Sequence, residues 1–118
     1  MNNTIERIDI GVSLADAELE SYYYNKDKNN LIIKIKNWEG KIIEFIFFDL
    51  VMFLDRGGNF IMDFCRNKSR TEFFQEALEK TYEKIPLNIP YKLFQFLDIS
   101  DETYLEIICE DFQFKIIK

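Results

Sequence analysis

The sequence has no histidine, only two cysteines, and few residues that interrupt regular structure: four glycines and two prolines in 118 residues. Without histidine the chain lacks the commonest general base at neutral pH, the commonest zinc ligand and the central residue of serine hydrolase triads. Cys65 and Cys109 are 44 positions apart, which fits neither a metal-binding pair, nor a redox pair, nor a disulfide-rich scaffold. We therefore expect two free thiols in a reducing compartment.

Motifs that bind phosphate or metal are also missing. Gly57 and Gly58 are followed by neither the lysine of a P-loop nor the third glycine of a dinucleotide-binding turn. Glu39-Gly40-Lys41 has the E-x-K form of some metal-dependent nucleases, but we expect it in a hairpin loop rather than on a strand. The sequence therefore predicts a protein that is not an enzyme, with no catalytic residues, no metal site and no cofactor.

Three acidic residues near the C-terminus raise the question of a calcium site. Asp98, Asp101 and Glu102 offer the oxygen ligands that Ca²⁺ takes, but the loop pattern of an EF-hand is absent. We interpret them as a solvated acidic turn.

Targeting segments are absent from the sequence as well. The first residues, MNNTIERIDIGV, lack the basic start and unbroken apolar stretch of a signal peptide, and no apolar run has the ~18 residues that span a bilayer. We expect a cytoplasmic protein that does not enter membranes.

What the sequence does contain is a large supply of aromatic residues: 12 Phe, 6 Tyr and 1 Trp. The length suits one domain over residues 1–118 with a single core. Because each ring buries roughly 150–250 Å², these rings exceed what a small core needs, and some of them are expected at the surface, where Tyr and Trp serve protein interfaces. A genome biased toward Phe, Ile, Lys and Asn codons is the alternative explanation.

The charge is acidic, with a formal net value of −6. This charge opposes binding to nucleic acid and to anionic membranes, and it favours a cationic protein partner. It is uneven, because the segment from Asp98 to the C-terminus carries six acids against Lys115 and Lys118: Asp98, Asp101, Glu102, Glu106, Glu110 and Asp111. Ordinary solubility is the alternative explanation for a charge of this size.

The clearest structural pattern is a hairpin formed by residues 31–37 and 41–48. A three-residue loop, Trp38-Glu39-Gly40, with Gly40 in the left-handed bulge position, places Lys34 opposite Glu44 and keeps the apolar residues on one face. A two-residue loop would place Lys34 opposite Phe45, which mixes charge into that face. The other face is still apolar at Ile32, Ile42, Ile46 and Phe48, so we expect the second strand to be covered on both sides.

The remaining segments complete the expected fold. Further strands are predicted at residues 18–24, 60–65, 91–98, 103–109 and 112–117, while residues 1–15 and 49–55 stay unassigned. Ser69-Arg70-Thr71-Glu72 has the form of a capping box, so a helix is expected from there to about Lys84, before Pro86. A tight turn at Glu110-Asp111 is expected to pair the last two strands, with Glu106 opposite Lys115.

This order of elements indicates an α+β fold: a mostly antiparallel sheet of about six strands with one main α-helix packed on one face.

Two aromatic segments contain candidate binding residues. Tyr22, Tyr23 and Tyr24 must alternate between the two faces of their strand, so one set faces solvent. Trp38 at the hairpin tip either folds back over the sheet or serves as an anchor for a partner, because Trp and Tyr dominate interface hot spots.

Together these features resemble the small acidic immunity proteins of bacterial polymorphic-toxin and contact-dependent inhibition systems. The segments that carry the resemblance are ADAELESYYY, LIIKIKNWEGKIIEFIFFDL, YKLFQFLDI and YLEIICEDFQF. The resemblance implies a cytoplasmic protein that binds and neutralises a cognate, cationic toxin domain, such as a nuclease, without turnover. It implies no particular fold and no particular site residues.

Charge and aromatic content then predict the partner-binding residues of a monomer or weak homodimer: Glu18, Glu20, Tyr22, Tyr24, Trp38, Asp98, Asp101, Glu102, Glu110 and Asp111. The alternative function is a small acidic secretion chaperone that holds an effector segment as a homodimer. An enzyme or a small-ligand binder is a third class. The single convincing helix favours the immunity protein, because a secretion chaperone usually needs helices that frame its dimer.

Overall fold

The computed structural model describes residues 4–117. In this range it has one helix, α1 (Glu72–Thr81), and nine strands: β1 (Ile5–Arg7), β2 (Glu18–Asn25), β3 (Asn30–Lys36), β4 (Ile42–Phe48), β5 (Met52–Asp55), β6 (Asp63–Asn67), β7 (Lys92–Leu97), β8 (Thr103–Cys109) and β9 (Asp111–Ile116). Lys118, which enters the expected charge of the C-terminal segment, lies outside the described residues.

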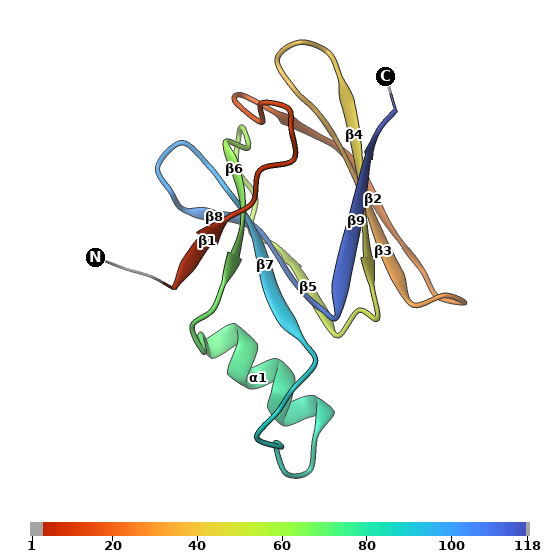
Figure 1. Cartoon of the computed structure of the whole chain (residues 1–118), viewed down its shortest axis with the longest axis vertical. Coiled ribbons are helices and arrows are strands. Elements are labelled where there is room, and N and C mark those ends of the chain that lie inside the picture. The colour runs from red at the N-terminus through yellow and green to blue at the C-terminus, as the bar shows by residue number, and fades with distance from the viewer. Residues whose placement is uncertain (1–3, 118) are drawn as a thin grey trace.

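The strands form two antiparallel sheets that face each other (Figure 1). The five-stranded sheet has the order β1-β6-β7-β8-β5, and the four-stranded sheet has the order β2-β3-β4-β9. The prediction of mostly antiparallel strands with one helix is confirmed, but a single sheet of about six strands is wrong. The chain changes sheet after β1, β4 and β8, and strand patterns reveal which face is buried but not which sheet a strand joins.

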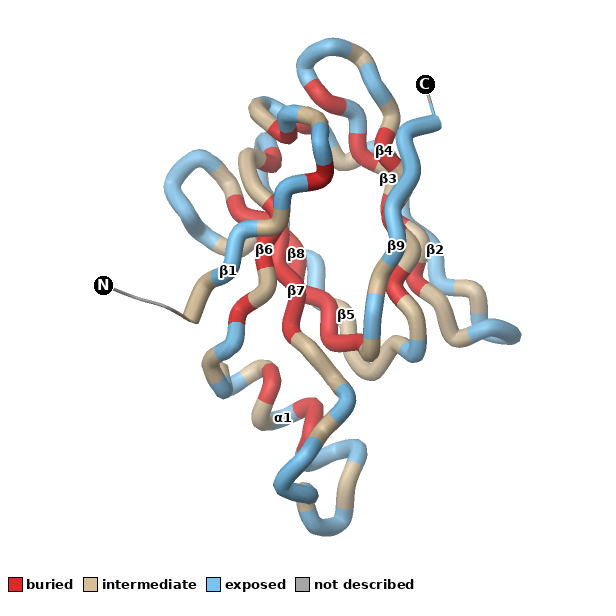
Figure 2. Tube along the Cα trace, viewed as in Figure 1, coloured by how far each residue is buried: buried red, intermediate tan, exposed pale blue. Residues whose placement is uncertain are grey.

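Phenylalanine rings fill the space between the two sheets. The ring centroid of Phe45 lies 5.0 Å from that of Phe64 and 5.1 Å from that of Phe96, both on the opposite sheet. Phe112 approaches Phe64 at 5.1 Å and Phe94 at 5.0 Å. Figure 2 shows that buried residues concentrate where the sheets face each other. Much of the aromatic supply is therefore core, and the expected surplus lies elsewhere: Tyr22, Tyr23, Tyr24, Trp38, Phe60 and Phe114 are exposed.

The register of the β3–β4 hairpin is confirmed. Lys34 lies opposite Glu44, and the Lys34 Nζ atom lies 3.8 Å from a Glu44 carboxylate oxygen. The Asn37 N–H donates to the Lys41 carbonyl at 2.9 Å, which closes the three-residue loop. Gly40 has a φ of +82°, the left-handed conformation that this loop requires and that glycine adopts without steric cost.

Helix α1 packs on the outer face of the five-stranded sheet. Its buried residues Phe74, Ala77 and Leu78 meet Leu93 of β7 and Ile108 of β8. These residues recur at the helical period and form one apolar stripe, so the expectation of a helix packed on one face of a sheet is confirmed.

The helix ends differ from the sequence prediction. The N-cap is Thr71 rather than Ser69, because the Thr71 hydroxyl accepts from the Phe74 N–H at 3.1 Å. The Ser69 hydroxyl instead donates to the Asn67 side chain at 2.6 Å. The helix ends at Thr81, ahead of Pro86, because Tyr82 already has an extended backbone.

The expected pairing of the last two strands is wrong. β8 pairs with β7 and β5, whereas β9 crosses to the other sheet and pairs with β4. Lys115 consequently lies 3.4 Å from Glu44 rather than opposite Glu106. Both arrangements put Leu105, Ile107 and Phe112 toward the core, so parity within the strands could not distinguish them.

Two smaller segments also differ. The unassigned residues 49–55 contain β5, and the strand expected at residues 60–65 begins later, at Asp63, with an isolated bridge at Ile61.

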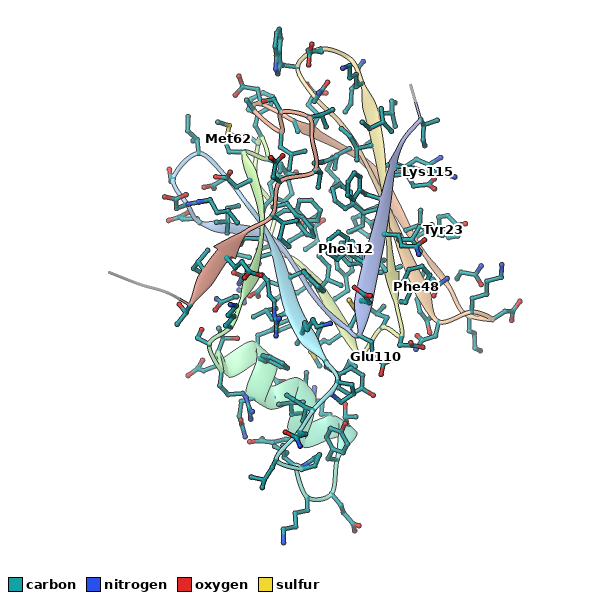
Figure 3. The ribbon with its side chains drawn as sticks, viewed as in Figure 1. Tyr23, Phe48, Met62, Glu110, Phe112 and Lys115 are labelled. Atoms are coloured by element: carbon teal, nitrogen blue, oxygen red, sulfur yellow. The ribbon has the colours of Figure 1, made fainter. Side chains whose placement is uncertain are left out.

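Strand β4 is not covered on both sides as expected. On its outer face Ile42, Ile46 and Phe48 are half-buried, and no element among residues 4–117 packs over them. Figure 3 shows Tyr23, Phe48 and Lys115 on this outer side and Phe112 between the sheets.

No helix in the described part of the chain is long and apolar enough to cross a membrane.

Candidate functional site

A cleft with a volume of about 1000 Å³ lies on the outer face of the five-stranded sheet. Helix α1 covers one part of this face through Leu93 and Ile108, and the cleft occupies another part. Its lining is mostly polar and comes from β1, β6, β7, β8 and the segments beside them: Ile5, Arg7, Arg56, Gly57, Asn67, Thr71, Gln95, Leu97, Asp98, Asp101, Glu102, Thr103 and Glu106.

A chain of buried polar side chains forms the floor of the cleft. Asn67 of β6 donates to Gln95 of β7 at 3.3 Å, and Gln95 donates to Glu106 of β8 at 2.8 Å. The three residues are only 9%, 4% and 3% exposed. Antiparallel pairing makes this possible, because Gln95 lies directly opposite Glu106. Each buried group thereby gains a partner and avoids the cost of an unsatisfied polar atom.

Arg56 completes this chain of hydrogen bonds. Its Nε donates to one Glu106 oxygen at 2.8 Å, and one of its terminal nitrogens lies 2.7 Å from the same oxygen. The other Glu106 oxygen accepts from Gln95. Since both oxygens of Glu106 are occupied and the side chain is 4% exposed, this carboxylate organises the floor of the cleft and is not free to bind a ligand.

Arg7 connects the cleft to its acidic rim. One terminal nitrogen lies 2.7 Å from Asp63, and the other lies 3.3 Å from Asp101. Both arginines of the lining are therefore paired with carboxylates of this chain. Within residues 4–117 the Glu102 carboxylate has no ion pair, so the uncompensated charge of the cleft is negative.

The rim acids come from the tight turn that joins β7 to β8. An Asp98 oxygen accepts from the backbone N–H groups of Ser100 and Glu102, at 2.8 and 3.0 Å. Asp101 has a φ of +59°, which acidic and amide side chains tolerate better than most. The turn thus holds Asp98, Asp101 and Glu102 together at the edge of the cleft, as three of the ten predicted binding residues.

The other predicted residues lie elsewhere. Glu110 and Asp111 form the turn between β8 and β9, at the opposite end of β8 from the rim acids. The pKa of Glu110 is raised above its usual range, first by a hydrogen bond with the neighbouring Asp49 side chain. Trp38 is 65% exposed at the tip of the β3–β4 hairpin, so it does not fold back over the sheet.

Strand β2 carries the remaining four predicted residues, Glu18, Glu20, Tyr22 and Tyr24. Tyr22 and Tyr24 share a face, since they pair with Ile33 and Leu31, and Tyr23 has the opposite direction. The Tyr22 hydroxyl donates to Asp55 of the five-stranded sheet at 3.1 Å, and this bond raises the pKa of Tyr22. The ten predicted residues thus occupy four separate places, and the cleft brings only three of them together.

Both cysteines are buried and free. Burial raises the pKa of the Cys65 thiol to about 11 and that of Cys109 to about 12. Neither thiol is therefore a nucleophile at neutral pH.

Among the described residues, no three His, Cys, Asp or Glu side chains gather in a way that could hold a metal ion.

Sequence reasoning did not identify the floor of the cleft, although the sequence contains a clue. Gln95 interrupts the apolar run YKLFQFL, and Glu106 interrupts the run YLEIIC. Because side chains alternate along a strand, each of these polar residues lies on a single, defined face of its strand. A polar residue inside a buried strand requires a partner, so these two positions could have been predicted to face each other. Arg7, Arg56 and Asn67 carry no comparable pattern.

The chain was compared with protein-family models, with curated proteins and with solved structures, and none of the three comparisons finds a match. Any inference about function therefore rests on the chain's own geometry and charge.

Proposed function

We propose that this protein is an immunity protein that binds a basic region of a cognate toxin domain at the cleft on the five-stranded sheet, and that it performs no catalysis. One observation carries the proposal: the cleft has a rigid, fully hydrogen-bonded polar floor and a rim of carboxylates that exceed its arginines. A lysine or arginine side chain from a partner would meet negative charge there without displacing an internal ion pair of Glu106.

The physical basis is electrostatic complementarity. Rim carboxylates attract a cationic surface over several ångströms and mainly increase the association rate. A partner side chain that enters the cleft loses water and gains charge-assisted hydrogen bonds, which chiefly lowers the dissociation rate. Asp98, Asp101 and Glu102 can act together because one turn holds all three.

The experiment measures binding to the cognate toxin domain that the proposal requires. We expect a variant with Asp98→Lys, Asp101→Lys and Glu102→Lys to bind roughly tenfold or more weakly, with a smaller salt dependence, and to lose protection of cells that express the toxin. The matched control reverses three exposed acids of the helix segment, Glu76, Glu79 and Glu83, which changes the total charge equally. Unchanged binding and protection in the cleft variant would overturn the proposal.

The form of the toxin that binds distinguishes the two main hypotheses. An immunity protein binds the folded toxin domain and abolishes its activity, whereas a secretion chaperone binds an unfolded segment. Binding only to a denatured or truncated toxin would favour the chaperone.

A further inference from the structure

The two sheets have four edge strands, and three of them carry features that discourage pairing with another chain. β1 has three residues and β5 has four, which is short for an edge strand. β2 is longer, but it contains a register shift between Leu19 and Ser21 and begins with acidic residues. Bulges, charges and short length are the usual means of protecting a sheet edge. β9, the fourth edge, has no bulge and six regular residues.

The backbone of β9 has hydrogen-bonding groups that face away from its sheet. The Ile117 N–H donates to the Ile42 carbonyl at 2.8 Å, so the groups of Ile117 point toward β4. Because these directions alternate along a strand, Gln113 and Lys115 also point toward β4, and Phe114 and Ile116 point toward the free edge. Consistently, the Phe112 N–H is occupied by the Asp111 side chain rather than by β4.

The side chains at this edge are apolar and exposed. Phe114 and Ile116 share the core-facing side of the sheet, opposite Phe45 and Ile43, yet they are 40% and 45% exposed. Their partners on β4 are completely buried. An exposed strand edge with apolar side chains on its core side is a template for adding another strand.

One antiparallel register of β9 with itself pairs opposite charges. If Gln113 lies opposite Gln113 of a second copy, each Phe112 faces a Phe114, and each Asp111 faces a Lys115 of opposite charge. A register centred on Lys115 would place two lysines against each other, which is unfavourable. In the favoured register the Phe114 N–H meets the Phe112 carbonyl across the strands, and the Phe112 N–H exchanges the Asp111 side chain for the Phe114 carbonyl, as an antiparallel ladder requires.

We propose that β9 is a self-association edge, and that two copies of this chain pair through β9 around a twofold axis centred on Gln113, which joins their four-stranded sheets into one continuous sheet. The second copy is the occupant that the apolar edge and the Asp111–Lys115 complementarity select. This inference is independent of the proposed toxin binding, because the cleft lies on the other sheet.

A cysteine cross-link tests the register. In it, Gln113 and its copy form a non-hydrogen-bonded pair with Cα atoms about 4.5 Å apart, within the range that a disulfide spans. We expect Gln113→Cys to form a covalent dimer under mild oxidation. The matched control, Ser21→Cys, places an exposed thiol on β2, the opposite edge of the same sheet, away from the proposed contact, and should remain uncross-linked. The native thiols do not interfere, because both are buried.

Sedimentation velocity over a range of concentrations tests the association itself. We expect reversible dimerisation of the natural sequence, and a dissociation constant raised roughly tenfold or more in Phe114→Lys. Phe60→Lys is the control, because Phe60 is similarly exposed, at 45%, and precedes β6 of the other sheet. The proposal is wrong if the natural protein stays monomeric at all concentrations, if Phe114→Lys dimerises unchanged, or if Gln113→Cys cross-links no better than Ser21→Cys.

Discussion

The two sheets of this protein bury similar apolar inner faces but have different outer faces. The outer face of the five-stranded sheet is divided between the helix and the polar cleft, where Gln95 and Glu106 are almost completely buried. The outer face of the four-stranded sheet carries Lys34, Glu44 and Lys115 as a row of paired charges between half-buried apolar residues. The five-stranded sheet therefore carries the cleft on its outer face, whereas the four-stranded sheet has the β3–β4 hairpin at its centre.

The difference extends to the edges. The five-stranded sheet ends in two very short strands, β1 and β5, whereas the four-stranded sheet ends in the longer β2 and β9. One sheet therefore offers a concave polar surface, and the other offers a strand for pairing. In general, concave charged surfaces recognise partners through electrostatic complementarity, whereas free strand edges do so by adding a strand.

The largest expected effect breaks the contact between the sheets. Phe45→Ala removes a ring that contacts Phe64 and Phe96 of the opposite sheet, and Phe45 is 0% exposed. We expect a loss of about 3–5 kcal/mol in the free energy of unfolding, because a buried ring is replaced by a cavity. Urea unfolding measures it, with Phe60→Ala as the exposed control. A loss below about 1 kcal/mol would mean that the sheets do not pack through Phe45.

A smaller effect distinguishes the charge pairs of the two outer faces. Glu106→Ala leaves Gln95 and Arg56 without their acceptor, and we expect a loss of about 1–3 kcal/mol, reduced because the Arg56 side chain is 47% exposed. Glu44→Ala removes pairs with Lys34 and Lys115, both well exposed, and should cost less than about 1 kcal/mol. Unfolding midpoints of the two variants give the comparison, and equal losses would contradict the difference between the two faces.

The smallest effect concerns the tyrosine that connects the sheets. The Tyr22 phenol donates to Asp55, so it is expected to deprotonate above the ordinary value of about 10. Because folding favours the protonated phenol, this contribution to stability is present below the unfolded pKa and is lost as pH rises through the folded pKa. Tyrosine NMR shifts followed against pH measure the transition. Asp55→Asn should lower the pKa of Tyr22, whereas Asp27→Asn in the β2–β3 loop should not.

The sequence predicted well where the interactions were local. The β3–β4 register pairs residues at most 18 positions apart. It could be predicted because, of the two loop lengths compared, only the three-residue loop keeps Lys34 and Glu44 off the apolar face. The bounds of β8 also matched, because its seven residues form a continuous β-favouring segment. The N-cap was misplaced by two residues because Ser69 and Thr71 are both good capping residues, and the Ser69 hydroxyl instead donates to the Asn67 side chain.

The candidate site was less accessible to sequence reasoning. Asp98, Asp101 and Glu102 were identified because they lie in one turn. Arg56 lies 50 positions from Glu106, and Asn67 lies 28 positions from Gln95. Only the pairing of β5 with β8 and of β6 with β7 brings them together. Strand β9, which follows Glu110, illustrates the same limit, because the alternation of its side chains is compatible with pairing in either sheet.

The sequence by itself determined which residues of each strand share a face, the register of the local hairpin and the acidic turn, because these depend on alternation and on short loops. The tertiary structure alone decided which sheet each strand joins, that Arg56 and Asn67 join Gln95 and Glu106 beneath a cleft, and that β9 ends a sheet with Phe114 exposed. The physical reason is that the alternation of side chains specifies a face, whereas the choice of neighbouring strand depends on packing between residues distant in sequence.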